Sequence, residues 1–272
     1  MHAHRADPTP RASTSPVLVP ALSRALTLLE RLAQRREPMS LARLASELEL
    51  PKSSVHGLCS TLLRYGYLAR QDDGAFRIGP GVMPLAEAFV SGTGLTQEFN
   101  ALWAERAPDE TVILSVLNGR DVVYIGARNG RRPLGLAFNV GMRLPAHLAA
   151  TGRAMLAHRP PSAVRELFDG AELAMMNGRG PRSVDELLDE LARTRQRGHS
   201  VDDEGVRAGV YCIGAPVFDA TAQPVAGLGV CLNKAMLGDD AGARHRDAVL
   251  RAARTLTQRL GGRPRSEERR VG

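Results

Sequence analysis

Aromatic residues and cysteines are scarce in this chain of 272 residues. Phe, Trp and Tyr make up 4% of it, and the three cysteines, Cys59, Cys212 and Cys231, include no CxxC pair. An odd number of cysteines without that spacing predicts neither a disulfide framework nor a zinc site. We expect small, buried apolar side chains at these positions, most clearly at Cys59.

Long apolar runs are absent as well. A helix that crosses a bilayer needs ~20 apolar residues, whereas the longest runs here, such as Thr111–Leu117, have the length of a strand. The first residues also lack the apolar segment of a signal peptide. These absences predict a cytoplasmic protein that does not enter a membrane.

Sequence motifs of common enzyme classes are missing too. The chain has no GxSxG, GxxxxGK[ST], HExxH or GxGxxG pattern. Nothing in the sequence brings Cys212 and His147 together as a nucleophile and a base, and His158, His199 and His245 lack the spacing of metal ligands. We therefore predict no enzyme, no cofactor and no metal site, and we expect His147 to be a structural hydrogen bonder.

The overall composition is that of a globular protein with a basic excess. Hydrophobic residues make up 43% and charged residues 24% of the chain, and 36 Lys and Arg against 29 Asp and Glu give a formal net charge of +7. This excess suits nucleic acid, an anionic surface or an acidic ligand, and it does not choose among them. The length favours two domains.

Apolar spacing predicts a small helical domain near the amino terminus. Leu22, Leu26, Leu29 and Leu32 recur at helical spacing, Ser40 stands where a cap begins a helix, and Asp73-Gly74 is a tight-turn signal. The expected segments are a mobile arm at 1–16, helices at 20–36, 41–49 and 52–65, and strands at 67–70 and 75–78. Three helices followed by a hairpin are the layout of a winged helix-turn-helix, here at residues 17–79.

The third predicted helix has the side chains of a DNA-reading element. An α-helix fits the major groove, where short hydrogen-bonding side chains reach bases and phosphates. No acidic residue occurs from Pro51 through Arg70, so no carboxylate there repels phosphates. The residues predicted to contact DNA are Ser40, Lys52, Ser53, Ser54, His56, Ser60, Thr61, Arg64, Arg70 and Arg77. Alternatively, the hydroxyls only solvate an exposed helix of a protein-binding module.

The rest of the chain predicts a linker helix at 80–94 and an α+β domain at 95–261. The expected strands are 111–117, 121–127, 134–138, 211–218 and 225–232, and the expected helices are 95–105, 148–158, 162–168, 183–197 and 240–260. Turn pairs between strands favour a mainly antiparallel sheet with helices around it. The tail at 262–272 is expected to be disordered, and its last eight residues resemble translated adapter sequence more than protein.

Several motifs resemble the IclR family of bacterial transcriptional regulators. Residues 20–29, 50–56 and 66–68 with the predicted wing are similar to its amino-terminal domain, and residues 143–147, 151–157 and 202–216 are similar to its effector-binding domain. The resemblance covers roughly residues 17–261. It implies an α+β fold in which a winged helix-turn-helix is joined by a linker helix to a GAF-like α/β effector domain. One departure is Gly57, where many members have an arginine, so a DNA contact of the family is expected to be missing.

The resemblance also implies a pocket for a small organic or aromatic acid. The matching positions are Ala150, Thr151, Asp202, Cys212, Gly229 and Cys231, and Ala150, Thr151 and Gly152 near a helix start would offer N–H groups to a carboxylate. Similar small-acid sensors have serines in place of Gly229 and Cys231, which favours a larger or more apolar ligand here. Asp202 disfavours an adjacent anion unless a cation or a water intervenes. Alternatively, Gly229 serves helix-to-sheet packing, the cysteines fill the core and residues 202–204 form a solvated turn.

Together these features predict a ligand-responsive regulator that binds a double-stranded DNA operator. A homodimer or homotetramer is expected, because symmetric proteins read near-palindromic sites. The effector would act by favouring one arrangement of the DNA-binding domains, with the linker helix as transmitter. The alternatives are a protein-interaction module without DNA binding and, from another class, a small-molecule enzyme.

Overall fold

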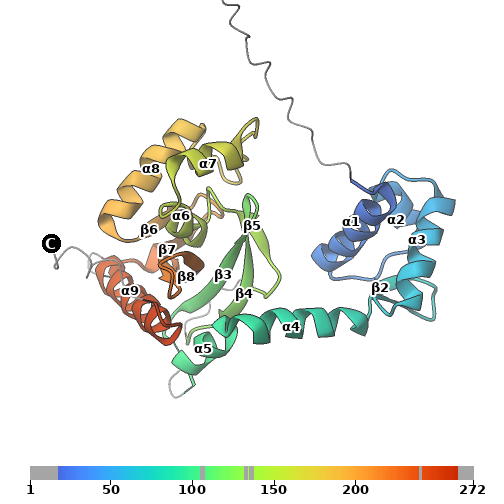
Figure 1. The fold of residues 1–272 in the computed structure, drawn as a ribbon, viewed down its shortest axis with the longest axis horizontal. Helices are drawn as coiled ribbons and strands as arrows, with labels where there is room; N and C mark the ends of the chain where they lie inside the picture. The colour runs from blue at the N-terminus through green and yellow to red at the C-terminus, as the bar shows by residue number, and fades with distance from the viewer. Residues whose placement is uncertain (1–17, 105–107, 132–133, 135–137, 239–240, 263–272) are drawn as a thin grey trace, which may run out of the picture. The chain divides into compact units, whose positions relative to one another are not determined.

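The computed structural model describes residues 18–104, 108–131, 134, 138–238 and 241–262, and Figure 1 labels its helices and strands. The chain divides into two compact units, Met1–Glu87 and Ala88–Gly272. The division falls inside helix α4 (Met83–Thr93), which follows a 3-10 turn at Pro80–Val82. Within the described ranges, no helix is long and apolar enough to cross a membrane.

The first unit consists of three helices and a β-hairpin (Figure 1). Its elements are α1 (Pro20–Arg35), α2 (Leu41–Glu47), α3 (Lys52–Arg64), β1 (Leu68–Arg70) and β2 (Phe76–Ile78). The two strands pair antiparallel, with Ala69 opposite Arg77. Buried side chains of all five elements form one core, among them Leu28, Leu32, Leu44, Val55, Cys59, Leu68 and Phe76. A winged helix-turn-helix arrangement results, as the apolar spacing predicted.

Short-range contacts hold α2 in place. The Ser40 side chain accepts a hydrogen bond from the backbone N–H of Arg43, which confirms its predicted capping role. The Glu47 carboxylate lies 3.2 Å from the Arg35 guanidinium and 3.8 Å from that of Arg31, so ion pairs join α2 to α1. These contacts fix the helix that precedes the turn into α3.

The apolar residues of α1 lie on two faces, and only one of these faces enters the core. Leu28 and Leu32 are buried, whereas Leu22 and Leu26 are 59% and 53% exposed. The sequence placed Leu22, Leu26, Leu29 and Leu32 on a single core-facing stripe, which is wrong for the first half of the helix. An exposed apolar surface remains at the amino-terminal end of α1.

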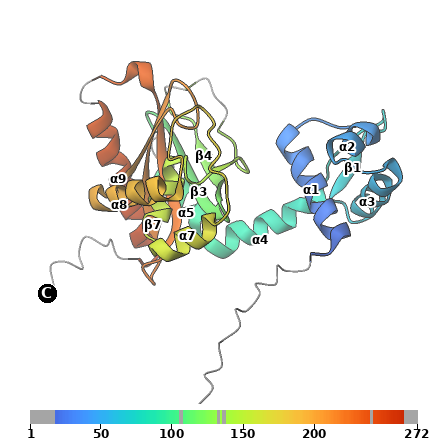
Figure 2. The same cartoon turned by 90° about the horizontal axis from the view of Figure 1, so that it is seen from above.

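The second unit is built on one six-stranded antiparallel sheet with helices on both faces (Figures 1 and 2). The strand order is β5-β4-β3-β8-β7-β6. The strands are β3 (Thr111–Asn118), β4 (Asp121–Arg128), β5 (Arg143–Pro145), β6 (Ser200–Asp203), β7 (Val210–Phe218) and β8 (Pro224–Asn233). The helices are α5 (Leu95–Leu102), α6 (Ala150–Leu156), α7 (Pro161–Phe168), α8 (Val184–Arg197) and α9 (Ala241–Arg259), with a 3-10 turn at Lys234–Met236.

Alternation along the strands produces two separate cores. Ile113 and Cys231 point to the face that α6, α7 and α8 cover. Val112 and Leu228 point to the opposite face, which α5 and α9 cover. Because neighbouring residues of a strand face opposite ways, each central strand contributes to both cores.

Glycines on β7 and β8 let the backbone of α6 lie directly on the sheet. A Cβ atom at Gly214 would stand 2.5 Å from the backbone of Ala150, and one at Gly227 would stand 2.6 Å from the carbonyl oxygen of Thr151. Real Cβ atoms do not approach that closely, so only glycine fits at these two positions. The start of α6 is therefore pressed against the middle of the sheet.

Two edge strands were not predicted. β5 pairs with β4, and β6 pairs with β7. Their sequences, Arg143–Pro145 and Ser200–Asp203, are short and carry proline or acidic residues, which are typical of turns. The predicted strand at 134–138 falls largely outside the described residues, and neither Leu134 nor Phe138 is in a strand.

Candidate functional site

Helix α3 presents one buried and one exposed face. Val55, Cys59 and Leu62 enter the core of the first unit. The side chains predicted to contact DNA lie on the exposed face: Lys52, Ser53, Ser54, His56, Ser60, Thr61 and Arg64. Within the described residues, the charged ends of Lys52 and Arg64 have no ion-pair partner. The helix thus offers hydroxyls, an imidazole and two unneutralised cations on one surface.

The hydroxyl groups of this face differ in the hydrogen bonds that they remain free to form. Ser60 donates to the carbonyl oxygen of His56 at 2.9 Å, and Thr61 donates to that of Gly57 at 3.0 Å. Their oxygens keep lone pairs that can accept from a base amino group. Ser53 and Ser54 have no side-chain hydrogen bond in the described part of the chain, so they remain able to donate to phosphate.

The two arginines of the wing lie on opposite faces of the hairpin. Arg70 is paired with the buried Phe76, and Arg77 is paired with Ala69 on the other face. The Arg70 guanidinium lies over the Phe76 ring, 5.7 Å from its centroid, and donates to the carbonyl oxygen of Gly74 at 3.3 Å. Arg77 is exposed and has no ion pair among the described residues. Arg77 is therefore the better placed of the two for a nucleic-acid backbone.

A cavity of about 370 Å³ lies between the sheet of the second unit, the start of α6 and the loop after β6; we call it the effector cavity. Its lining residues include Ala150 and Thr151 from α6, Asp202 from β6, Cys212 from β7 and Gly229 from β8. These are five of the seven residues predicted for an effector site. The structure thus brings together residues that are up to 79 positions apart in the chain.

Gly152 and Cys231, the other two predicted residues, do not line the effector cavity. A Cβ atom at Gly152 would stand 2.3 Å from the carbonyl oxygen of Ala146, so this glycine permits tight packing of α6 against the preceding segment. Cys231 is fully buried beside Cys212 on the neighbouring strand β8, with the two sulfur atoms 2.8 Å apart.

Gly229 does not provide the extra space that its small size suggested. A Cβ atom there would stand 2.8 Å from the Thr151 methyl group and 3.0 Å from the Ile113 side chain. The room is already filled by helix-to-sheet packing, the alternative that the sequence left open. The breadth of the effector cavity comes instead from its other walls.

Asp202 is a buried carboxylate with a backbone donor and a buried cation near it. It accepts a hydrogen bond of 2.7 Å from the backbone N–H of Gly205. Burial raises the pKa of Asp202, and the buried Arg153 guanidinium opposes this effect. Asp202 was expected to disfavour an adjacent anion unless a cation or a water intervenes; Arg153 is a buried cation close enough to act on the pKa of Asp202, and it does not itself line the effector cavity.

Sequence reasoning missed the aromatic and cationic walls of the effector cavity. The rings of Tyr124 and Phe138 stack with centroids 6.4 Å apart and an interplanar angle of 21°. Arg143 and Arg207 also line the cavity, and Arg143 pairs with Asp121 at 3.0 Å. Arg207 has no ion pair within the described ranges. Arg143 belongs to a motif of the resemblance, which was a usable signal, whereas Arg207 sits in a loop without one.

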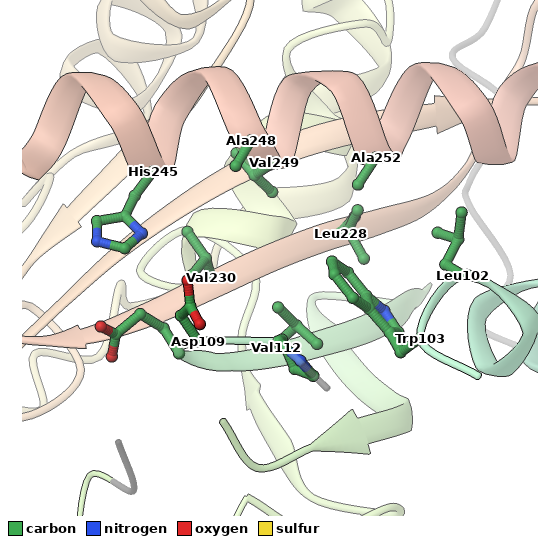
Figure 3. Close-up of a pocket in the computed structure, with 12 residues that line it drawn as sticks. Leu102, Trp103, Asp109, Val112, Leu228, Val230, His245, Ala248, Val249 and Ala252 are labelled. Carbon is green, nitrogen blue, oxygen red and sulfur yellow. The ribbon is translucent and has the colours of Figure 1, made fainter. Parts of the chain in front are cut away.

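A second cavity, of about 330 Å³, lies on the opposite face of the sheet, under α9. Val112, Leu228 and Val230 form its floor, since they alternate with the residues of the effector cavity. Figure 3 shows Leu102 and Trp103 at one end and His245 and Asp109 at the other. None of the predicted effector residues lines this cavity.

The predicted structural role of His147 agrees with its surroundings. Its Nε2 atom lies 2.9 Å from the carbonyl oxygen of Ala174, and its ring packs edge-on against Phe168. Burial lowers the pKa of His147. In the described residues no group of three or more His, Cys, Asp or Glu side chains is arranged to hold a metal ion.

The chain matches family models over most of its length. Residues 21–72 match the IclR helix-turn-helix domain, and residues 99–258 match the C-terminal domain of the bacterial transcriptional regulator IclR. This protein belongs to the IclR family. The IclR-family assignment makes it a DNA-binding transcriptional regulator with an effector-binding domain.

This IclR-family protein is similar to known regulators over nearly the whole length of both chains. The acetate operon repressor of Salmonella typhimurium is 28% identical over 93% of this chain and 95% of its own. The Agobacterium tumefaciens repressor BlcR is 37% identical, with a TM-score of 0.58 over 90% of this chain and 99% of that one. An IclR homolog from Microbacterium hydrocarbonoxydans, solved with 4-hydroxybenzoate, is 19% identical and shares the fold, with a TM-score of 0.68 over 88% and 99% of the two chains.

Gly57 is the position where this IclR-family regulator departs from the motif in α3. A Cβ atom there would meet nothing within 4 Å, so packing does not require glycine. Glycine inside a helix costs about 1 kcal/mol relative to alanine. The exposed face of α3 therefore has no side chain at position 57 that could contact DNA.

Proposed function

We propose that this protein binds its operator through the exposed face of α3 and through the face of the wing that carries Arg77. We further propose that its affinity for the operator changes when an aromatic carboxylic acid occupies the effector cavity. The observation that carries the proposal is the joining of aromatic and cationic walls in one cavity of the effector domain. The match to the IclR helix-turn-helix domain supports DNA binding, and the residues named below are those that we propose make the contacts.

The DNA contacts divide into two kinds. Lys52, Arg64 and Arg77 suit phosphates, because they are exposed cations without a neutralising partner in the described residues. The hydroxyls and the His56 imidazole suit base edges in the major groove. A surface of this kind gives binding that weakens steeply with salt.

The effector cavity suits a planar ring with a carboxylate. Tyr124 and Phe138 supply ring faces, and the remaining walls are largely apolar. Arg207 supplies a cation that no described residue neutralises. The relative from Microbacterium hydrocarbonoxydans has 4-hydroxybenzoate bound, which is a ligand of this chemistry.

The exposed apolar face at the start of α1 supports self-association. Leu18, Val19, Leu22 and Leu26 are more than half exposed and follow one another at the start of this helix. A second copy of the chain is the occupant that fits, because a two-fold dimer presents two recognition helices to a near-palindromic operator. Leu22→Glu should give monomers in analytical ultracentrifugation and weaken operator binding, whereas an exposed control, Thr27→Glu, should do neither.

Coupling between effector and DNA requires a ligand that binds one arrangement of the dimer better than another. Helix α4 is the only continuous chain segment between the two units, since the division falls inside it. A ligand without such a preference would bind and change nothing.

The test is calorimetric titration of the full chain with 4-hydroxybenzoate, beside operator binding measured on the DNA upstream of the gene. Val206→Trp fills the effector cavity from a partly exposed loop, and it should abolish ligand binding and leave operator binding intact. Ala252→Trp is the matched control in the second cavity and should bind the acid normally. Loss of binding in the control alone would move the effector to the second cavity.

Arg207→Gln tests recognition of the carboxylate. A charge-assisted hydrogen bond is worth about 1.5–3 kcal/mol, so the acid should bind roughly ten-fold to a hundred-fold more weakly. 4-Hydroxybenzamide, which has no charge, should bind the wild type weakly and lose little in the variant. An equal loss for acid and amide would contradict the role of Arg207.

A further inference from the structure

Cys212 and Cys231 face each other across neighbouring strands. They are direct partners in the register of β7 and β8, and their sulfur atoms lie 2.8 Å apart. Both are buried, and Cys212 lines the effector cavity whereas Cys231 does not. The sequence predicted both cysteines as residues of an effector pocket or, alternatively, as core fillers, and it predicted no disulfide framework.

We propose that Cys212 and Cys231 form a reversible disulfide when a small uncharged peroxide enters the effector cavity. The sulfur of Cys212 attacks one peroxide oxygen and becomes a sulfenic acid as the O–O bond breaks and the first water leaves. The sulfur of Cys231 then attacks that sulfur, the S–S bond forms and a second water leaves. Two thiols and one hydrogen peroxide thus give one disulfide and two waters, and a dithiol reductant reverses the reaction.

The backbone already has the geometry that a disulfide needs. Directly opposite residues of antiparallel strands have Cα atoms about 4.5–5.5 Å apart, and disulfides span about 4.4–6.8 Å between Cα atoms. An S–S bond measures about 2.05 Å, so the two sulfur atoms, now 2.8 Å apart, need only a small side-chain movement. The sheet does not have to rearrange.

The surroundings select both the order of attack and the kind of oxidant. Cys212 meets the effector cavity and Cys231 does not, so Cys212 encounters the peroxide first. The hydrogen bond to Cys231 and burial raise the pKa of Cys212, which lowers its thiolate fraction and makes the reaction slow. Because Cys212 is buried and meets the effector cavity, a small oxidant such as hydrogen peroxide reaches it more readily than a bulky disulfide such as oxidised glutathione.

The third cysteine provides an internal control. Cys59 lies in the core of the first unit, and burial raises its pKa to about 11. It has no cysteine partner in the described residues, so it should stay reduced.

Oxidation would also change the effector cavity, and this part of the inference rests on the proposed function. The disulfide draws the Cys212 sulfur toward Cys231 and removes an S–H group from the cavity wall. An aromatic acid should then bind with altered affinity. The effector cavity would thus respond both to the acid and to the peroxide.

The experiment counts free thiols in the full, folded chain. The protein is exposed to hydrogen peroxide, freed of it, alkylated in denaturant and examined by mass spectrometry. The wild type should go from three alkylated cysteines to one, with a linked pair of peptides that contain Cys212 and Cys231. Cys59→Ser should lose both remaining thiols, whereas Cys212→Ser should keep its other two.

Three alkylated cysteines after exposure, a disulfide that includes Cys59 or a second chain, or a sulfinic acid at Cys212 without pairing would each overturn the proposal. The linked peptides are read in the wild type, so an unfolded variant does not affect the result. The thiol count needs no effector, so it stands if the proposed function fails; titration of 4-hydroxybenzoate into reduced and oxidised protein tests the coupling separately.

Discussion

The hydroxyl of Ser115 donates a hydrogen bond of 2.7 Å to the hydroxyl of Thr151, inside the second unit and away from solvent. Ser115 belongs to the central strand β3, and Thr151 is the second residue of α6. The bond fixes the start of the helix on the sheet at the point where Thr151 lines the effector cavity. We therefore expect stability and effector binding to depend on the same pair of side chains.

Thr151→Val should destabilise the second unit, although it leaves the volume of the side chain almost unchanged. The substitution leaves the Ser115 hydroxyl buried without its acceptor, which costs about 1–3 kcal/mol. Ser115→Ala combined with Thr151→Val should recover part of that loss, because no unpaired polar group remains. Urea unfolding followed by the fluorescence of Trp103, the single tryptophan, measures each variant. Additive losses in the double variant would mean that the two hydroxyls do not depend on each other.

Gly214→Ala should destabilise the second unit through its backbone neighbour. The added Cβ atom would stand 2.5 Å from the backbone of Ala150, and overpacking of this kind costs about 1–3 kcal/mol. Gly57→Ala is the matched control, since its Cβ would meet nothing within 4 Å and the helix gains up to about 1 kcal/mol. The Trp103 transition should shift to lower urea for Gly214→Ala alone, while circular dichroism should show a more stable first unit for Gly57→Ala. An unchanged Gly214→Ala transition would mean that α6 is not held against the sheet.

Local sequence signals predicted the helices and the long strands of this protein, because their causes are local. Ser40 caps α2 and Ser183 caps α8, where it accepts from the backbone N–H of Glu186. Both caps are readable from a few neighbouring residues. Alternation of apolar residues likewise marks β3 and β8, which serve the two cores.

Features that depend on contacts between distant segments were not predictable. β5 exists only because β4 offers it an edge, and Arg207 becomes part of a cavity only when its loop closes over the sheet. Leu22 has the same spacing as core leucines, and nothing in the sequence reveals that no described element of its own unit covers it. Gly229 was taken to make space, whereas the neighbouring Thr151 and Ile113 side chains fill it.

Acid should destabilise the folded protein partly through His147. Burial lowers the pKa of His147 below its usual value of 6.5, so the unfolded chain binds this proton more readily than the folded one. The contribution is fully present above pH 6.5 and declines as the pH falls through 6.5 toward the lower folded pKa. His147→Gln should flatten the dependence of the unfolding free energy on pH in this range. A residual slope is expected from His199, whose pKa burial also lowers, and identical slopes in both proteins would contradict the role of His147.

The two arginines of the wing should behave differently toward DNA. Arg77 faces outward with no ion-pair partner in the described residues, so Arg77→Ala should weaken binding to all sequences and reduce the salt slope by about 1. Arg70 lies over Phe76 and bonds to Gly74, so Arg70→Ala should lower the melting temperature of the first unit more than it changes the salt slope. Fluorescence anisotropy with labelled operator DNA at several salt concentrations measures the slopes, and circular dichroism measures the melting. If Arg70→Ala reduced the slope and Arg77→Ala did not, the inner face of the hairpin would be the one that meets the phosphates, and the orientation proposed for the wing would be reversed.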